Sequence, residues 1–415
     1  MFAPGTTGAV QAGVVVMTAV LTLSGFNYLY QLMSARWLGA ADFGVVATLG
    51  SILMIVALPF GAVQLFVARD VAAEAAGGDV DPLEADALST VVLLATVGLA
   101  GLTIVLSPWI SSLLQISSWI PVILTGLALA TAIPLIPLIG VLQGKQHFFA
   151  YSAALVTGAG VRLAALACLL IVGFGLNGAL GATVIGGGAA IVVAAINTKG
   201  WHISRAALTG PRTRRVLRKV LPMTLGLLAV TALANTDIVV VKGSLSPDAA
   251  GTFGAAGLVA KVALFVPAAI IPIVQSRVAI RHAQKRSSSD ILLRATLATV
   301  AFGIVFTAFC WATATPLMTI AFGAEFASAA DILPLYCVAM TLVSVATLRV
   351  NFFLTRGENG VGYIALACAV AQAVALIVWH ATLVQVLVVD IIAAAALIAI
   401  DVTVTTRANA AHRHA

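Results

Sequence analysis

The stretch ARWLGAADFG (residues 35–44) is a short polar segment between two long apolar runs, and a looser version, GSLSPDAAGTFG (residues 243–254), lies in the same setting further along the chain. Aligning residues 38–44 with residues 245–251 gives an offset of 207 residues. A turn that recurs in the same context indicates an internal repeat.

Three further pairs keep their order at nearly the same offset. They are Asn27 with Asn235, Arg69 with Arg277, and Tyr151 with Tyr363. We therefore predict two six-span halves, residues 1–197 and 221–415, joined by a basic cytoplasmic linker, residues 198–220. Because six is even, both halves enter the membrane from the same side, which makes them a parallel repeat related by an axis along the membrane normal.

The composition is that of a polytopic membrane protein. Of the 415 residues, 61% are hydrophobic and 9% are charged, which is too little polar surface for a soluble protein of this size. Apolar runs of about 20 residues match the thickness of a bilayer and predict about twelve transmembrane helices in an all-α chain. The expected spans are 10–34, 43–68, 88–107, 119–142, 150–173, 177–196, 221–241, 250–275, 291–313, 329–348, 361–381 and 384–404.

Lysine and arginine alternate sharply between the connections. One side collects Arg69, Lys145 and the basic runs 199–219 and 277–294, whereas the other side holds Arg36 and Lys242. By the positive-inside rule the basic side is cytoplasmic, so both termini are expected in the cytoplasm. The net charge of +7 is then a signal for orientation. We expect a multi-pass protein of the cell membrane and no nucleic-acid partner.

We find no catalytic motif in the sequence. The connections are too short for a soluble catalytic domain, no Walker or GxSxG motif is present, and the histidines and cysteines lack metal spacing. We expect no enzyme, no catalytic residue, no metal and no cofactor other than a coupling H⁺ or Na⁺.

The segment RWLGAADFGVVATLGSILMIVALPFGAVQLFVAR resembles the start of the polysaccharide-exporting flippases of the MOP (MATE-like) superfamily, the Wzx-like O-antigen flippase family. That family's pattern is roughly R-x-L-G-x-x-D/E-F/Y-G. The stretches LQGKQHFFAYS, LANTDIVVVKGSLSPDAAGTF and FGAEFASAADIL resemble later parts of the same family. The resemblance covers most of the chain. It implies a V-shaped pair of six-helix lobes that moves lipid-linked sugars between leaflets by alternating access.

Two cations lie deep inside apolar runs, Arg162 in GAGVRLAALA and Lys261 in GLVAKVALF. A charge near mid-membrane costs roughly 2.5–3.5 kcal/mol on insertion scales, so it usually faces a cavity or a partner. Arginine and lysine are natural partners of phosphate, and the diphosphate of a polyprenyl carrier is one candidate ligand. A structural ion pair or snorkelling to the interface is the alternative for both residues.

Asn235 and Asp237 lie near the outer end of the expected span 221–241. Asp237 is placed to pair with Lys261 on the next helix, either as a structural ion pair or as part of a coupling-ion or proton relay. Asn235 is a further candidate for the substrate cavity.

Asn27 and Gln31 are one helical turn apart and share a face. They are candidates for binding sugar hydroxyls, or alternatively for hydrogen bonds to neighbouring helices. In the first copy of the repeated segment, residues 35–44, Arg36 is expected to cap the hairpin together with Asp42. Asp390 and Asp401 receive no role.

A flippase for lipid-linked (polyprenyl-diphosphate) oligosaccharide is the leading functional hypothesis, with the lipid-linked sugar, membrane lipid and envelope polysaccharide synthesis enzymes as partners. An ion-coupled small-molecule or drug antiporter of the same superfamily is the first alternative. A non-transporting membrane subunit of an envelope-synthesis complex is the second.

Cysteine labelling tests the orientation. In a cysteine-free background, a membrane-impermeant reagent added to intact cells should label Pro247→Cys and leave Arg212→Cys unlabelled until the cells are permeabilised. Labelling of Arg212→Cys in intact cells, with none at Pro247→Cys, would invert the topology.

Overall fold

The computed structural model describes residues 6–77, 82–198, 210–265, 288–358 and 360–414, with isolated positions between 266 and 287. All regular structure in these residues is helical, which confirms the predicted all-α class. The helices are α1 (Thr6–Ala57), α2 (Gly61–Ala75), α3 (Pro82–Val105), α4 (Ser107–Leu113), α5 (Ile120–Gly144), α6 (Phe148–Ile171), α7 (Gly175–Asn197), α8 (Gly210–Leu233), α9 (Thr236–Ser244), α10 (Pro247–Ala260), α12 (Ser289–Ala321), α13 (Ala329–Thr355), α14 (Gly360–Val378) and α15 (Leu383–His414). Short 3₁₀ turns are η1 (Leu58–Phe60), η3 (Lys261–Leu264) and η4 (Ala324–Phe326).

Ten helical segments in the described residues are long and apolar enough to cross a membrane. The first, Val14–Ala75, is 62 residues long and joins two expected spans, 10–34 and 43–68. The helical conformation breaks inside it at Gly39, where φ is +76° and ψ is 174°. The expected span 250–275 lies partly outside the described residues. The total of twelve spans therefore stays a prediction.

The break at Gly39 requires glycine because of its backbone conformation. Its positive φ lies in the region that side chains with a Cβ rarely adopt. The glycine of the opening motif is therefore the point where α1 changes direction.

The chain divides into two compact units. Unit 1 comprises Met1–Leu38 and Phe60–Leu221, and unit 2 comprises Gly39–Pro59 and Pro222–Ala415. The assignment of residues 39–59 to unit 2 is a feature that the sequence repeat does not anticipate. The predicted division into 1–197, 198–220 and 221–415 stays a prediction, because residues 199–209 of the linker lie outside the described part of the chain.

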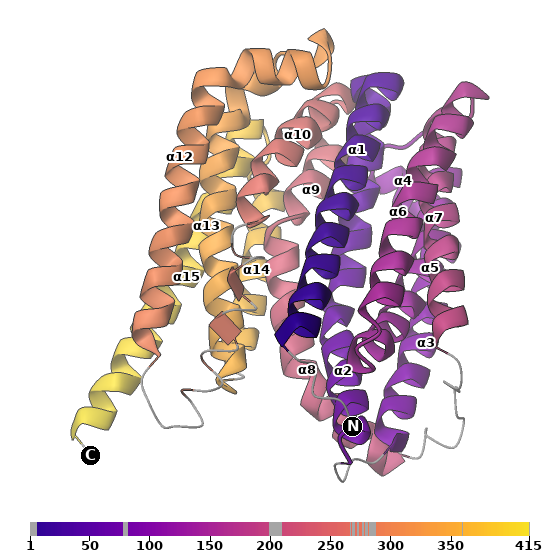
Figure 1. Ribbon diagram of the computed structural model, residues 1–415. Helices are drawn as coiled ribbons and strands as arrows, with labels where there is room; N and C mark the ends of the chain where they lie inside the picture. Colours follow the sequence, from indigo (N-terminus) through magenta and orange to yellow (C-terminus); the bar gives the residue numbers. More distant parts are fainter. Residues whose placement is uncertain are drawn as a thin grey trace. The chain divides into compact units, whose positions relative to one another are not determined.

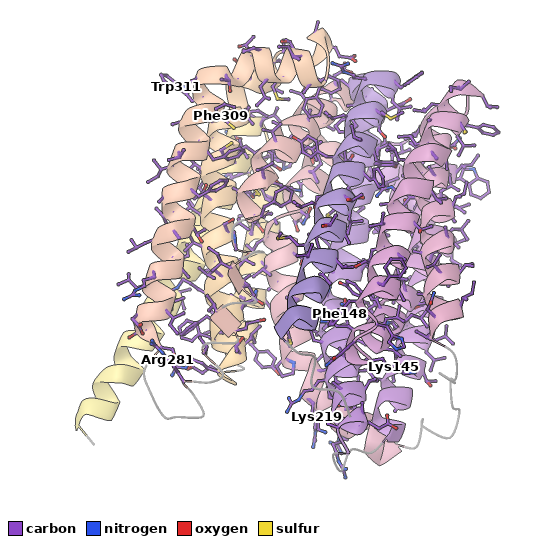
Figure 2. All side chains as sticks on the ribbon, in the orientation of Figure 1. Lys145, Phe148, Lys219, Arg281, Phe309 and Trp311 are labelled. Atoms are coloured by element: carbon purple, nitrogen blue, oxygen red, sulfur yellow. The ribbon has the colours of Figure 1, made fainter. Side chains whose placement is uncertain are left out.

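Within unit 1, α5 packs on α2, α3 and α7, and α6 lies beside α7 (Figure 1). Small residues allow the last pair to approach closely. A Cβ on Gly186 would lie 2.6 Å from the carbonyl oxygen of Gly158 and 2.5 Å from Cβ of Arg162. Lys145 and Lys219, which the charge pattern assigns to the same side of the membrane, lie at the same end of unit 1 (Figure 2).

Within unit 2, α13 packs on α10, α12 and α15. One apolar cluster of buried residues, including Leu233, Phe352 and Leu397, joins α8, α13 and α15. On the outside of α12, the exposed side chains of Phe309 and Trp311 point away from the unit, as expected of a surface in contact with lipid (Figure 2).

The two copies of the repeated turn pack against each other inside unit 2. Gly44 and Gly251 are the residues that the 207-residue offset aligns, and a Cβ on Gly44 would lie 2.8 Å from the backbone nitrogen of Gly251. A Cβ on Gly251 would lie only 1.8 Å from the carbonyl oxygen of Ala40. Glycine at both positions therefore lets the backbones of α1 and α10 touch, as small residues do between membrane helices.

Aromatic rings pack against each other beside this glycine contact. Phe43, the residue before Gly44, is buried with its ring centroid 6.4 Å from that of Phe322 and 5.9 Å from that of Phe326. Phe43 of the opening motif thus packs against the segment FGAEF (residues 322–326), which lies more than 270 residues later in the sequence.

The glycine contact predicts a large difference between two chemically identical substitutions. Gly251→Ala should lower the free energy of unfolding by about 1–3 kcal/mol, because the methyl group must push two backbones apart. Gly50→Ala, on the open side of α1 with no atom within 4 Å of its added Cβ, should leave stability unchanged or raise it by up to about 1 kcal/mol. Thermal unfolding of the purified proteins in detergent measures both. Equal melting temperatures for the two variants would contradict the contact.

Candidate functional site

A cluster of polar side chains lies in the interior of unit 2, between helices that are otherwise apolar. It contains Asn235 at the break between α8 and α9, Asp237 on α9, Lys261 at the start of η3, Tyr336 on α13, Gln372 on α14 and Asp390 on α15. All of these except the half-buried Lys261 are buried. Six polar side chains in such surroundings need partners, and the structure supplies most of them.

The break between α8 and α9 positions the first two members. Asn235 has left the helical conformation, with φ at −139°, and its amide donates to the carbonyl oxygen of Thr231 at 2.9 Å. This bond satisfies one of the carbonyls at the end of α8 that has no helical partner. Two residues later, Asp237 stands in the first turn of α9, where a negative charge is favourable.

Both carboxylate oxygens of Asp237 accept a hydrogen bond. The Tyr336 hydroxyl donates to Oδ2 at 2.5 Å, and the backbone N–H of Ile238 donates to Oδ1 at 2.8 Å. Asp237 is fully buried, so these two donors take the place of water around its negative charge.

Lys261 donates from Nζ to Oδ1 of Asn235 at 2.8 Å. The Asp237–Lys261 pairing considered in the sequence stays a prediction, because the hydrogen bond of the ammonium group goes to the amide of Asn235. Asp237 and Asp390 still lie within electrostatic range of the ammonium group. Lys261 is therefore already compensated from within unit 2.

Asp390 and Gln372 form the far side of the cluster. The Gln372 amide nitrogen donates to Oδ1 of Asp390 at 2.7 Å and to the carbonyl oxygen of Leu233 at 3.1 Å. Gln372 and Tyr336 did not enter the sequence-based set of candidates, and Asp390 received no role in it. Each of the three is a polar side chain inside an apolar run of the sequence. The same is true of many residues that hydrogen-bond only within their own helix, so this feature does not single them out.

A second, smaller cluster lies within unit 1 around Arg162 on α6. Its guanidinium carbon lies 3.5 Å from the centroid of the Tyr30 ring, and Nη1 donates to Oδ1 of Asn27 at 3.3 Å. Tyr30 is itself held by its hydroxyl, which donates to the carbonyl oxygen of Ala179 on α7 at 2.8 Å. Stacking on an aromatic face is a contact that arginine makes well.

This second cluster is only partly satisfied. Arg162 Nε and the side-chain oxygen of Gln31, one turn from Asn27 on α1, are buried, and neither has a hydrogen-bond partner among the described residues. The described part of unit 1 therefore leaves one donor on a cation and one acceptor on an amide unsatisfied, while Tyr30 and Asn27 hold Arg162 in place.

The hairpin candidates lie on either side of Gly39. Arg36 and Asp42 are both exposed, and their expected pairing stays a prediction. Asp42 lies within electrostatic range of Lys242, whose side chain is buried in unit 2. Among the described residues, no group of three or more His, Cys, Asp or Glu side chains is placed to hold a metal ion.

The compensation of Lys261 predicts a stability effect. Lys261→Met leaves the buried carboxylate of Asp237 without its cation and should lower the free energy of unfolding by about 3–5 kcal/mol. Adding Asp237→Asn removes the orphaned charge and should restore most of that loss. Lys145→Met, at an exposed lysine, is the matched control and should be neutral. Thermal unfolding in detergent is the measurement, and a double variant no more stable than Lys261→Met would contradict the coupling.

Neither family models nor curated proteins match the sequence. The structure, in contrast, is similar to solved structures over nearly its whole length. A multidrug resistance MATE family transporter of the MOP superfamily superimposes in its inward-facing conformation with a TM-score of 0.72 and 17% identity, covering 94% of this chain and 98% of that chain. The outward-facing conformation gives a TM-score of 0.66 and 17% identity, covering 97% of each chain.

A third similar structure is a MOP superfamily transporter from Pyrococcus furiosus, described as having a binding pocket of reverse polarity that suggests a different function. It has a TM-score of 0.63 and 16% identity, and the match covers 94% of this chain and 95% of that chain. Identities this low establish the fold alone. The chain is a multi-pass membrane protein with the fold of the MATE transporters.

Proposed function

We propose that the protein is a flippase that moves a lipid-linked oligosaccharide, carried on a polyprenyl diphosphate, across the cytoplasmic membrane by alternating access. The MATE fold supports a transporter, because its solved representatives include inward-facing and outward-facing conformations. The resemblance of the opening motif to polysaccharide-exporting flippases supports the substrate class.

The observation that carries this proposal is the charge balance around Arg162. The sequence holds no aspartate or glutamate in residues 6–38 or 120–197, which contain the unit 1 part of α1 and all of α5, α6 and α7. The cation of Arg162 is thus held by a ring and an amide, with no acidic side chain on any of these helices. A half-buried arginine in such surroundings favours an anion.

A diphosphate is chemically suited to the donor on Arg162 that has no partner among the described residues. Hydrogen bonds from a guanidinium to phosphate oxygens are strong and directional, and Nε is the donor that has no partner within the described residues. Asn27, which accepts a hydrogen bond from Arg162, and Gln31 lie one turn apart on α1. In this proposal their amides bind sugar hydroxyls. In this proposal Asn235 and Lys261 serve unit 2 rather than the substrate, since they already bond to each other.

An ion-coupled antiporter of small molecules is the second candidate. The descriptions of the similar structures as multidrug resistance transporters favour it, together with the two fully buried carboxylates of unit 2. A cationic drug would be repelled by Arg162, however, and unit 1 offers it no carboxylate on the helices around that residue. The Pyrococcus furiosus transporter supports the idea that this fold is compatible with pockets of different polarity.

Gene deletion and complementation test the proposal. Deletion should leave lipid-linked oligosaccharide made but stranded on the cytoplasmic leaflet, with less polymer at the cell surface. Arg162→Gln should restore export about 10- to 100-fold less well than the wild type, because one charged hydrogen bond is worth about 1.5–3 kcal/mol. Arg162→Lys, which keeps the charge, should restore more.

Arg294→Gln on α12 is the matched control, because it removes an exposed arginine from unit 2 and should export normally. Normal surface polysaccharide with altered sensitivity to cationic drugs would instead identify an antiporter. Loss of polymer without any stranded lipid-linked oligosaccharide would point to a non-transporting subunit of a synthesis complex with the polysaccharide enzymes.

A further inference from the structure

Asp390 and Gln372 leave two oxygen atoms unsatisfied in the interior of unit 2. One hydrogen bond already joins their side chains, from the Gln372 amide nitrogen to Oδ1 of Asp390 at 2.7 Å. The remaining oxygens of the same two groups, Oδ2 of Asp390 and Oε1 of Gln372, are buried and have no hydrogen-bond partner among the described residues. Both oxygens are acceptors as long as Asp390 is ionised, so neither can satisfy the other.

A single proton resolves this conflict. On Oδ2 it turns Asp390 from an acceptor into a donor, and Oε1 of Gln372 is the acceptor left free on the group that Asp390 already contacts. A carboxylic acid and a primary amide then exchange two hydrogen bonds in place of one. We propose that Asp390 is a proton-binding site, in which the Asp390 carboxylate takes up one H⁺ and shares it with Gln372.

The charges around Asp390 support the same assignment. The groups that face it are Asp237 on α9, Lys261 on η3, Tyr336 on α13 and Gln372 on α14. Lys261 supplies one positive charge, which balances one carboxylate and leaves the second in excess. A buried excess charge is costly, so one of the two carboxyl groups is neutral.

The hydrogen bonds indicate which of the two carboxyl groups, that of Asp237 or that of Asp390, is the neutral one. Asp237 receives a donor on each oxygen and stands at the start of α9, an arrangement that stabilises a carboxylate. Within the described part of the chain, Asp390 receives a donor on one oxygen only. Asp237 is therefore the partner that balances Lys261, and Asp390 is the carboxyl group that binds the proton.

A proton suits this site better than a metal ion. Hard divalent cations take six or more oxygen ligands, whereas the Asp390–Gln372 pair offers two free oxygens. The Lys261 ammonium, within electrostatic range of Asp390, also repels a second cation. Release of the proton leaves one uncompensated negative charge in the cluster. Any rearrangement of unit 2 that exposes or covers Asp390 is then linked to proton binding and release. The inference goes beyond the proposed function, because it holds for a transporter of any substrate.

Infrared spectroscopy of the purified full-length protein in lipid vesicles measures the proton directly. The wild type in potassium buffer at neutral pH should show the C=O stretching band of a protonated carboxyl group, and the band should disappear reversibly as the pH is raised. Asp390→Asn should lack the band. Asp331→Asn, which removes an exposed carboxylate from α13, is the matched control and should keep it unchanged.

Two further variants separate the proposal from simple burial. Gln372→Met should keep the band but shift it to the position of a carboxyl group without a hydrogen-bonded amide. Lys261→Met should increase the absorption, because Asp237 then takes up a proton as well.

Three results would overturn the proposal. The first is absence of the band from a wild-type protein that unfolds at its normal temperature. The second is a band that persists unchanged to the alkaline limit of stability, which would make Asp390 a permanently neutral structural group. The third is loss of the band when sodium replaces potassium at constant pH, which would identify a sodium site.

Discussion

A charge inside an apolar helix has to be compensated, and the two units of this protein meet that requirement in different ways. In unit 2, Lys261 is surrounded by Asn235, Asp237 and Asp390, so its compensation is internal. In unit 1, Arg162 contacts Tyr30 and Asn27, and residues 6–38 and 120–197 contain no aspartate or glutamate. We propose that the first arrangement is completed by one proton and that the second binds an anion from outside the chain. From this difference we propose that unit 1 binds the phosphate of the substrate and that unit 2 binds the proton.

Both arrangements depend on how closely the helices approach. Gly186 brings α7 against the backbone of Arg162, and Gly251 brings α10 against Ala40. Neither contact leaves room for a side chain. The repeated turn therefore has a physical meaning in unit 2, because its two aligned glycines, Gly44 and Gly251, form the close contact between the two copies. The exposed apolar residues of α12 show the opposite requirement, since their partner is lipid.

The sequence predicted the all-helical membrane class, and it drew attention to the repeat and to the charged residues, because each leaves a local signal. Apolar runs reveal spans, and Arg162 and Lys261 stand out as charges within them. The partners could not be read in the same way. Tyr336 is 99 residues from Asp237, and Gln372 is 139 residues from Leu233, so the packing of α8, α9, α13 and α14 brings them together. For the same reason the sequence suggested Asp237 as a partner of Lys261 but not the hydrogen bond from Lys261 to Asn235. The kink at Gly39 was predicted as a turn, but not the assignment of residues 39–59 to unit 2.

Binding of the carrier lipid to the purified protein tests whether Arg162 binds the diphosphate. Native mass spectrometry in detergent can compare polyprenyl diphosphate with the neutral polyprenol of the same chain length, for the wild type and for Arg162→Gln. We expect the wild type to bind the diphosphate about 10- to 100-fold more tightly than the alcohol, and Arg162→Gln to lose this preference. Equal binding of the two lipids by the wild type, or a preference that survives in Arg162→Gln, would contradict this expectation.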